Sequence, residues 1–584
     1  MKITFNLHSE KRAVSTLLLT MSLAAVALAL LAGAMGWSAS STRQTHRSIQ
    51  FDRSVAAAEA ATEKVLSRMA RDFLYGGESL VTANLASYRA NTVPTPADSA
   101  YWNGWEFNDG NGNPDQTYVQ FIGASNNITL NPPYAGLKAN VAIYSVVSHA
   151  RDTASVQDVI AGVLQQVQLA TIPIFQFALY SSGDMETSCG QPFKVTGHVH
   201  ANKTLYVEPD AFFLTFESGV TAVTGILDQR HPLDTRGAPA GGVLYSNLDD
   251  KVTPVDALTL PIGTTNTLEA IREIIEPPPL GESASSPAGK LRYYNLSEML
   301  LVVSNSGVYA TSGKFNNFST PVPTSELASF VTTTNSFQDD REHKTVRPID
   351  LDIGGLTAWS QTNTSLRPAL LGSGLHTNAT CVYVVDARTL SGSELGAVRV
   401  VNGRELPADG LTVATGRPLY VLGDYNQFDP ANLGTTNTIT TRPASLVADA
   451  ISILSTSWSD ANSTSPLASR AAAATTVNAA FLTGAVETTT GQYSGGMENF
   501  PRFLEAWGLG NAFTYNGSMI KMFPSLYATN VWGTPGIYYD PPARNWAYDL
   551  NFNNPALLPP KTPSVLKVIR TRWTRVAPGQ NVAP

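Results

Sequence analysis

Two histidines separated by one residue are the first candidates for chemistry in this chain. His198 and His200 lie in the segment FKVTGHVH, which reads as a strand, and residues two apart on a strand place their side chains on one face. Two imidazoles could supply half of a metal site, with a third ligand from Asp184 or Glu186 in the preceding turn. The simpler interpretation is a pair of histidines hydrogen-bonded in a turn or facing solvent, and we predict no metal ligand.

Carboxylate pairs could support glycosidic chemistry, which requires two carboxyl groups held about 5–9.5 Å apart. The pairs close in sequence are Asp184/Glu186, Asp339/Asp340 and Asp350/Asp352. Turns are rich in aspartate for backbone reasons alone. We therefore predict no catalytic residue and expect that the protein is not an enzyme.

Other chemical signals are weak. Ser373 lies in a Gly-Ser-Gly turn near His376, but the sequence contains no GxSxG, P-loop or HExxH motif. Trp102 and Trp105 could stack on sugars, although such residues more often pack within strands. No cofactor-binding residue is predicted.

The segment MENFPRFLEAWG, residues 497–508, predicts a short helix that caps the body of the protein. On such a helix Phe500, Phe503 and Leu504 would face inward. Arg502 and Glu505 are three residues apart and could form an ion pair on its surface.

The composition indicates a β-rich protein that does not bind nucleic acid. The chain has 584 residues, of which only 15% are charged, with 44 Gly and 36 Pro, a pattern typical of many short strands joined by turns. The net charge of −7 lacks the basic face that binding to nucleic acid needs. Two cysteines, Cys189 and Cys381, leave open one long-range disulfide or two buried thiols.

Residues 13–36 predict a transmembrane helix. The stretch carries no charge and follows Lys11 and Arg12; about 20 apolar residues cross the hydrocarbon core of a bilayer. Because positive flanks favour the cytoplasm, the N-terminus is predicted to be cytoplasmic. The alternative is a secretory signal peptide cleaved after Ala32-Gly33-Ala34.

The helix is predicted to continue well beyond the membrane, which favours an anchor over a cleaved signal. No proline occurs before Pro94. The apolar residues that follow are spaced three or four apart, which predicts one apolar stripe on a helix ending at Gly76-Gly77. The stripe consists of Phe51, Val55, Ala58, Ala61, Val65, Met69 and Phe73. It could pack on the protein's own core or on a partner helix.

Residues 10–75 contain a basic pair, an apolar span and the run DRSVAAAEAATEKVLSRM, with Ala57-Ala58-Glu59-Ala60-Ala61 at its centre. In these features the segment resembles the N-terminus of accessory type IV pilus proteins of the PilX kind. The resemblance implies a helix that anchors the subunit and packs in a pilus-like bundle with other pilin-like subunits. Ala13 and Leu18 stand where the pilin pattern has the glycine before the cleavage point and the glutamate of the mature chain, so N-terminal processing stays open.

The remaining chain is predicted to be mainly β. Strands starting at 411, 445, 478 and 513 are separated by about 34 residues, a spacing that favours a β-solenoid, or parallel β-helix, in which stacked coils bury an apolar column. An antiparallel β-sandwich is the alternative, because 411–416 and 419–424 could form a hairpin. Before these strands, Asp152 or Thr153 could cap a helix over 154–170 with Val156, Val159, Ile160, Val163, Leu164 and Val167 on one face.

These patterns divide the chain into six parts. They are a cytoplasmic N-terminus at 1–12, a transmembrane helix at 13–36, its continuation at 37–76, a small α+β section at 77–180, a β-rich solenoid-like domain at 181–530 and a proline-rich C-terminal tail at 531–584, expected to wrap the outside of the domain.

Several outer segments resemble an uncharacterised family of bacterial surface proteins, among them GHVHANKTLYV, GLTVATGRPLYVLGDYN and GGMENFPRFLEAWG. The resemblance implies architecture and no activity. We expect a single-pass protein of the bacterial membrane whose large domain lies outside the cytoplasm and acts in pilus-like assembly, secretion or adhesion. The alternative function is a membrane-tethered carbohydrate-binding or carbohydrate-active β-helix protein.

Overall fold

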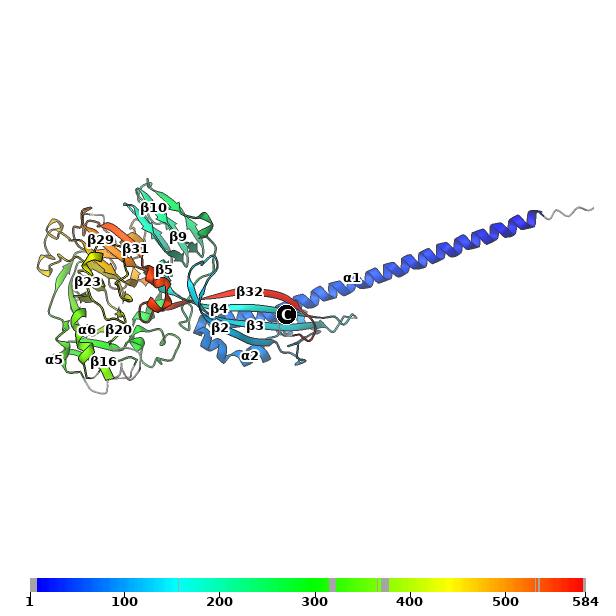
Figure 1. Cartoon of the computed structure of the whole chain (residues 1–584), viewed down its shortest axis with the longest axis horizontal. Coiled ribbons are helices and arrows are strands. Elements are labelled where there is room, and N and C mark those ends of the chain that lie inside the picture. Colours follow the sequence, from blue (N-terminus) through cyan, green and yellow to red (C-terminus); the bar gives the residue numbers. More distant parts are fainter. Residues whose placement is uncertain are drawn as a thin grey trace, which may run out of the picture.

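The computed structural model describes residues 8–155, 157–314, 322–364, 366–368, 378–530, 532–533 and 536–580. The protein is mainly β, with one long N-terminal helix and several sheets. Figure 1 shows three regions in a row: a protruding helical rod, an antiparallel sheet that covers the inner half of the rod, and a large β-rich body. We call the last region the body; it runs from residue 177 to residue 563.

The rod is α1 (His8–Ala83), one helix of 76 residues, or about 114 Å at 1.5 Å per residue. It passes through residues 33–40 without a break, so the predicted continuity of the helix beyond the membrane segment is confirmed. Gly77 has φ 71° and ψ −170°, a backbone conformation outside the helical region, so the predicted stop at Gly76-Gly77 is observed as a kink. The short helix α2 (Leu85–Ala90) follows.

Helix α1 packs on an antiparallel sheet in the order β1-β3-β4-β32, with β2 also pairing with β3. The bounds are β1 Trp105–Asn108, β2 Tyr118–Thr129, β3 Lys138–Asp152, β4 Ile160–Pro173 and β32 Ser564–Val576. The predicted helix over 154–170 is wrong, because Ile160–Pro173 is a strand. The side chains of this strand are buried on both faces of the sheet. A strand that is buried on both faces carries a nearly continuous apolar run.

The C-terminal segment is also different from the expected surface tail. Strand β32 returns to the sheet next to α1 and pairs with β4, with Ser564 opposite Pro173 and Val576 opposite Gly162. In Figure 1 β32 lies beside β4, although the two strands are far apart in the sequence. The body is therefore inserted between two neighbouring strands of the sheet that holds the helix.

The largest sheet of the body has 11 strands in the order β14-β11-β8-β5-β30-β27-β24-β22-β20-β15-β16. Neighbours are parallel except for the hairpin of β15 and β16. The bounds are β5 Phe177–Ser181, β8 His198–Ala201, β11 Val220–Ala222, β14 Lys251–Val252, β15 Met299–Ser304, β16 Gly307–Thr311, β20 Cys381–Asp386, β22 Leu411–Ala414, β24 Ala444–Ala448, β27 Ala480–Ala485 and β30 Met519–Pro524.

A second sheet of seven strands has the order β17-β19-β21-β23-β25-β28, with β18 paired to β19. The bounds are β17 Val331–Thr332, β18 Phe337–Asp339, β19 Lys344–Asp352, β21 Glu394–Val401, β23 Leu419–Leu422, β25 Ile451–Leu454 and β28 Arg502–Phe503. In this order, all neighbours from β19 to β28 pair in parallel.

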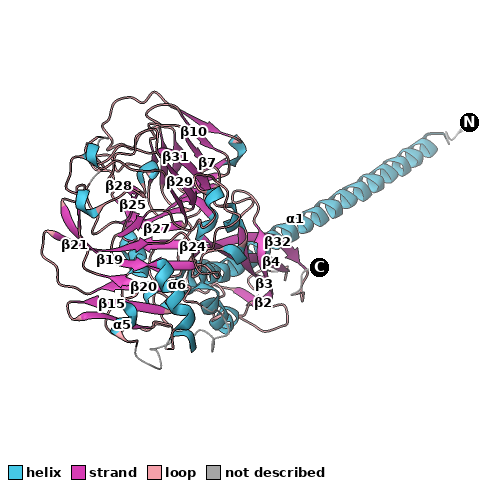
Figure 2. Cartoon of the chain, turned by 60° about the vertical axis from the view of Figure 1, so that its left-hand side comes forward, coloured by secondary structure: helices cyan, strands magenta, loops and turns pink. Residues whose placement is uncertain are grey.

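Three smaller sheets complete the body, and all their pairs are parallel. Their strands are β7 Phe193–Val195, β10 Phe213–Phe216 and β13 Gly242–Tyr245; β6 Met185–Thr187, β9 Thr204–Val207 and β12 Gly225–Leu227; and β26 Thr475–Asn478, β29 Ala512–Gly517 and β31 Ala543–Tyr548. The body also holds the short helices α3 Leu268–Arg272, α4 Tyr293–Leu296, α5 Thr324–Leu327 and α6 Ile353–Thr362. Figure 2 shows how strands dominate the body.

The parallel pairs follow the predicted spacing. Leu411 pairs with Ala444, and Ser445 pairs with Ala480, so each strand meets the next of the regularly spaced segments. The segments 411–414 and 419–422 do not pair with each other, because β22 lies in the 11-stranded sheet and β23 in the seven-stranded sheet. One continuous apolar core runs through the body.

The body is fastened to the helix and its sheet by a loop of residues 256–263. Lys567 of β32 pairs with Asp256 at 2.5 Å, and the Leu566 amide donates to the Thr259 carbonyl at 2.8 Å. The Gly263 amide donates to the carbonyl of Tyr75, on the last turns of α1, at 2.8 Å.

Candidate functional site on the long helix

The outer half of α1 is the most unusual surface of the molecule. Residues 15–49 are all exposed, and an 18-residue window of this helix has a mean hydropathy of 2.3. Among the described residues, α1 is the one helix long and apolar enough to cross a membrane. The exposed large apolar side chains of residues 15–37 are Leu17, Leu18, Leu19, Met21, Leu23, Val26, Leu28, Leu30, Leu31, Met35 and Trp37. So large an apolar surface marks an interaction site.

Polar side chains within and just beyond the apolar span are satisfied by the helix itself. The Thr20 hydroxyl donates to the Leu17 carbonyl at 2.9 Å, and the Ser22 hydroxyl donates to the Leu18 carbonyl. Further along, the Thr42 hydroxyl donates to the Ser38 carbonyl at 2.8 Å. These internal bonds suit a helix in lipid, where no water is present to accept them.

The inner half of α1 packs its apolar stripe against the sheet. Val55, Ala58, Ala61, Val65, Met69 and Phe73 are at most 6% exposed, and Phe51 is partly buried. They contact side chains of β3 and β4 such as Val146 and Val163. The predicted stripe is confirmed, and it packs on the protein's own sheet. Ala57, Ala58 and Ala61 bring the helix backbone close to that sheet.

Polar contacts fix the helix in register with the sheet. The Gln165 side-chain amide of β4 donates to Thr62 Oγ1 and to Glu63 Oε1, both at 3.0 Å. Arg570 of β32 also donates to Glu63. The Ser54 hydroxyl donates to the Val159 carbonyl at 3.0 Å. The helix is thus held by β4, which precedes the body in the chain, and by β32, which follows it.

His200, Asp184 and Glu186, three of the four residues considered for a metal site, are engaged in other contacts, and burial lowers the pKa of the fourth, His198. The ring nitrogens of His200 contact Thr221 Oγ1 at 2.8 Å and Asn202 Oδ1 at 2.9 Å, and burial lowers the pKa of His200 to about 4. Asp184 accepts from the Thr204 amide and Glu186 accepts from the Thr488 hydroxyl. Within the described ranges, no group of three or more His, Cys, Asp and Glu residues could hold a metal ion.

The other carboxylate pairs also have structural partners. Asp350 accepts two hydrogen bonds from Arg399, at 2.6 and 2.8 Å, while Asp352 accepts from the Gly355 amide at the start of α6. Asp339 accepts from the Tyr420 hydroxyl at 2.7 Å, while Asp340 forms an ion pair with Arg470.

The segment 497–508 is not the predicted helix. Residues 497–499 form a single 3-10 turn, and Arg502 and Phe503 form strand β28 at the edge of the seven-stranded sheet. Phe500, Phe503 and Leu504 are buried as expected. Arg502 pairs with Glu342 of another segment, and Glu505 accepts from Ser455 at 2.6 and 2.7 Å.

The remaining candidates are quickly placed. Cys189 and Cys381 are free, buried thiols. Trp102 and Trp105 are half-buried and, like Phe51 of α1, pack against the apolar cluster between α1 and the sheet. Ser373 and His376 lie outside the described residues.

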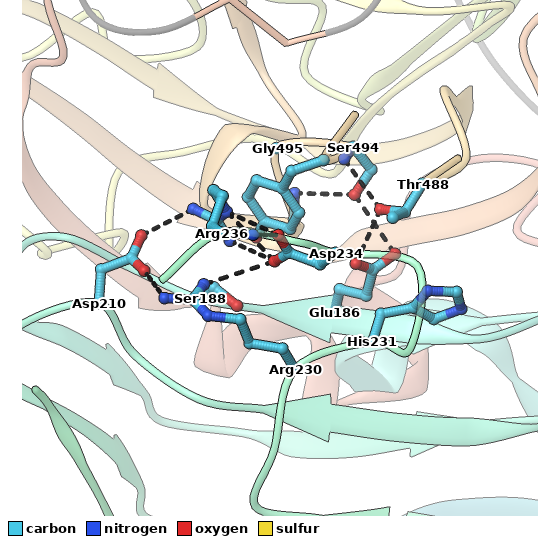
Figure 3. A network of polar contacts seen from close by, with 12 residues as sticks. Glu186, Ser188, Asp210, Arg230, His231, Asp234, Arg236, Thr488, Ser494 and Gly495 are labelled. Atoms are coloured by element: carbon cyan, nitrogen blue, oxygen red, sulfur yellow. Dashed lines mark hydrogen bonds and ion pairs between the residues drawn. The ribbon is translucent and has the colours of Figure 1, made fainter. Parts of the chain in front are cut away.

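Sequence reasoning missed a polar network on the body (Figure 3). Arg236 lies between Asp210 and Asp234 and donates to both at 2.8 Å, while Arg230 contacts the same two carboxylates. The Arg236 guanidinium also lies 3.7 Å from the centroid of the Tyr493 ring. The dense run of charges at 228–236 was the one available signal, because the partners at 210 and 493 are far away in sequence.

Comparisons with known proteins find similarity among solved structures. No protein-family model matches the sequence, and no curated protein matches it. Among solved structures, the chain is similar to the competence-associated pilin ComZ from Thermus thermophilus, with 11% sequence identity and a TM-score of 0.30; the match covers 91% of this chain and 97% of that chain. A TM-score of 0.30 does not establish a shared fold. The function is therefore inferred from the helix and sheets of the chain itself.

Proposed function

We propose that this chain is a membrane-anchored, extracytoplasmic structural subunit of a pilus-like or secretion-system assembly. One observation carries the proposal: a single helix is exposed over residues 15–49, with its apolar span at 15–37, and is packed on an antiparallel sheet over its inner half. An apolar rod of this length is stable in lipid and costly to expose to water.

The charges around the rod set the proposed orientation. Lys11 and Arg12 precede the apolar span, which favours a cytoplasmic N-terminus and an outward-facing body. About 20 residues suffice to cross the hydrocarbon core, yet exposed helix continues to residue 49. Residues 37–49 would then stand between the membrane and the sheet, where neighbouring pilin-like helices could pack against them. This stretch is the proposed contact with other subunits of the assembly.

We further propose that the body is a β-solenoid with a structural or adhesive role outside the cell. Support comes from parallel pairs whose partners are about one coil apart, such as Val199 with Val220 and Leu411 with Ala444. The non-enzymatic role is supported by the ion pairs and hydrogen bonds that occupy the candidate carboxylates, among them Asp350 and Asp339.

The proposal is tested by removing the apolar character of the rod. In the double variant Leu23→Arg/Leu30→Arg, each arginine would cost roughly 2.5–3.5 kcal/mol at the centre of a membrane span. We expect the wild-type protein to stay in the membrane pellet after alkaline carbonate extraction and the double variant to become soluble or to be degraded. Arginines placed beyond the span, Ser40→Arg/Thr42→Arg, should leave the protein in the pellet. A wild-type chain that carbonate releases would contradict the anchor.

A further inference from the structure

The body contains a cavity beside the polar network, and its walls come from widely separated segments. The cavity has a volume of about 280 Å³ and is lined by residues that include Gln191, Asp210, Arg236, Tyr493, Glu498 and Arg544. Trp532 and Tyr539 add aromatic walls. Binding pockets for small molecules typically combine aromatic walls with a few convergent polar groups.

Most charges around the cavity cancel. Arg230 and Arg236 are matched by Asp210 and Asp234 through four ion pairs. Arg544 is different, because no aspartate or glutamate among the described residues forms an ion pair with it. Its Nε atom donates to the Glu498 carbonyl at 3.0 Å and its Nη2 atom to Asn499 Oδ1 at 3.1 Å. The half-buried guanidinium thus keeps an uncompensated positive charge at the wall of the cavity.

Glu498 does not neutralise that charge at mildly acidic pH. The carboxyl is buried; its Oε1 accepts from the Tyr493 hydroxyl at 2.8 Å and from the Ser188 amide at 3.2 Å, and its Oε2 has no hydrogen-bond partner. Burial raises the pKa of Glu498 to about 7. The second carboxylate of the cavity, Asp210, is held by two arginines. At mildly acidic pH the positive charge of Arg544 therefore stays available to an anionic ligand.

The aromatic walls indicate the shape of the ligand. The Trp532 indole donates to the Tyr539 hydroxyl at 2.6 Å, and that hydroxyl donates to Asn499 Oδ1 at 2.8 Å. The Trp532 and Tyr493 rings meet edge to face at 5.7 Å. The half-buried Trp532 ring offers apolar surface to the carbon–hydrogen face of a sugar, while Gln191 offers an amide group to its hydroxyls.

We infer that this cavity binds a saccharide that carries a carboxylate, with Arg544 pairing with the carboxylate and the Trp532 ring packing on the sugar. Guanidinium groups pair well with carboxylates because the two have matching planar geometry. The inference concerns the body alone and is independent of how the helix is anchored.

The test is isothermal titration calorimetry of the full chain in detergent micelles with an oligogalacturonate as the probe. The methyl-esterified oligomer is the matched control, since it keeps the sugar rings and loses the negative charge of the carboxylates. We expect binding of the acid form and at least roughly tenfold weaker binding of the ester, because the ester cannot form the charge-assisted hydrogen bonds with Arg544.

Variants locate the binding site. Arg544→Gln should weaken binding of the acid form roughly tenfold or more, while Arg544→Lys should retain part of it. Gln191→Trp fills the cavity from its rim without touching the hydrogen bonds described above, so it should abolish binding and leave the unfolding temperature unchanged. Arg572→Gln, at an exposed position on β32, is the control and should bind like wild type. Equal binding of acid and ester, wild-type affinity in Arg544→Gln or Gln191→Trp, or no binding of the acid form would overturn the inference.

Discussion

The small residues on the inner half of α1 set how closely the helix approaches its sheet. Ala58 is fully buried against the sheet, whereas Ala56, two residues earlier, is exposed. A leucine at position 58 would have to push the helix away from β3 and β4. We expect Ala58→Leu to lower the free energy of unfolding of the helix and sheet by about 1–3 kcal/mol. Chemical denaturation of the purified protein in micelles measures the loss.

The exposed neighbour provides the control. Ala56→Leu adds the same volume where there is space for it and should change the free energy of unfolding by less than about 0.5 kcal/mol. Equal losses in the two variants would mean that the buried face of α1 has been assigned wrongly.

The buried carboxyl of Glu498 makes stability depend on pH. Burial raises its pKa from an ordinary value of 4.5 to about 7, so the folded protein binds a proton that the unfolded chain releases. Its contribution is fully present below pH 4.5 and is lost as the pH rises through 7. Glu498→Gln removes this loss. Between pH 5 and pH 8 the free energy of unfolding of the variant should therefore rise relative to that of wild type by on the order of 2 kcal/mol.

Unfolding curves of the two proteins at both pH values measure this difference and cancel the other titrating groups. Glu405 is exposed, and Glu405→Gln should follow wild type at both values. Parallel pH profiles of wild type and Glu498→Gln would show that Glu498 is ionised in the folded protein.

At the residue scale, the sequence predicted local patterns and missed long-range contacts. The stripe from Val55 to Phe73 was predictable because helical spacing places those side chains on one face. The cavity was not, because Asp210, Tyr493 and Arg544 meet only when three segments that are distant in sequence fold together. No local spacing encodes such a meeting.

At the scale of elements, β32 is the part whose loss should separate the helix from the body. Leu566 is buried against α1 and β4 in the cluster that contains Val65 and Met69. An aspartate at position 566 would bury an unpaired charge, which destabilises by several kcal/mol. We expect Leu566→Asp to expose the sheet to limited proteolysis, with new cuts in residues 85–176 and 564–576 identified by mass spectrometry.

A charge on the exposed part of the same strand tests whether burial is the cause. Trp573 is 45% exposed, so Trp573→Asp should leave the proteolysis pattern of wild type. If Leu566→Asp also left that pattern unchanged, β32 would not hold the sheet closed.

Two of the wrong element assignments, those of 154–170 and of the C-terminal tail, have physical reasons. Strand β4 lies between β3 and β32 and is buried on both faces, so its apolar residues show no alternation and their spacing also fits a helix. Its valines and isoleucines, which are β-branched, were the signal for a strand. Strand β32 was not predicted because it follows a proline-rich stretch and because its partner β4 precedes the whole body in the chain.

The spacing of the later strands was predictable for the opposite reason. Each parallel partner is the next segment of similar type, so the repeat appears directly in the sequence. Ser445 of β24 pairs with Ala480 of β27, and Phe481 of β27 pairs in turn with Met519 of β30. The earlier strands repeat at a shorter spacing, as Val199 and its partner Val220 show, and this spacing was not anticipated.

At the scale of the whole molecule, the body is carried by two covalent connections. The chain leaves the sheet after β4 and returns at β32, where Ser564 lies opposite Pro173. A force on the body would therefore be shared by two adjacent antiparallel strands that both pack on α1. Such a mount suits a body held at a distance from a membrane by a rigid rod (Figure 1).

The central claim is that the rod spans a membrane and holds the body outside the cytoplasm. Protease treatment of intact bacterial cells, with detection of the body by an antibody to residues 177–563, tests both parts at once. We expect the body to be digested or released without breaking the inner membrane, once any outer membrane is permeabilised, while a cytoplasmic marker survives. A body that stays protected until the inner membrane is lysed would contradict the account.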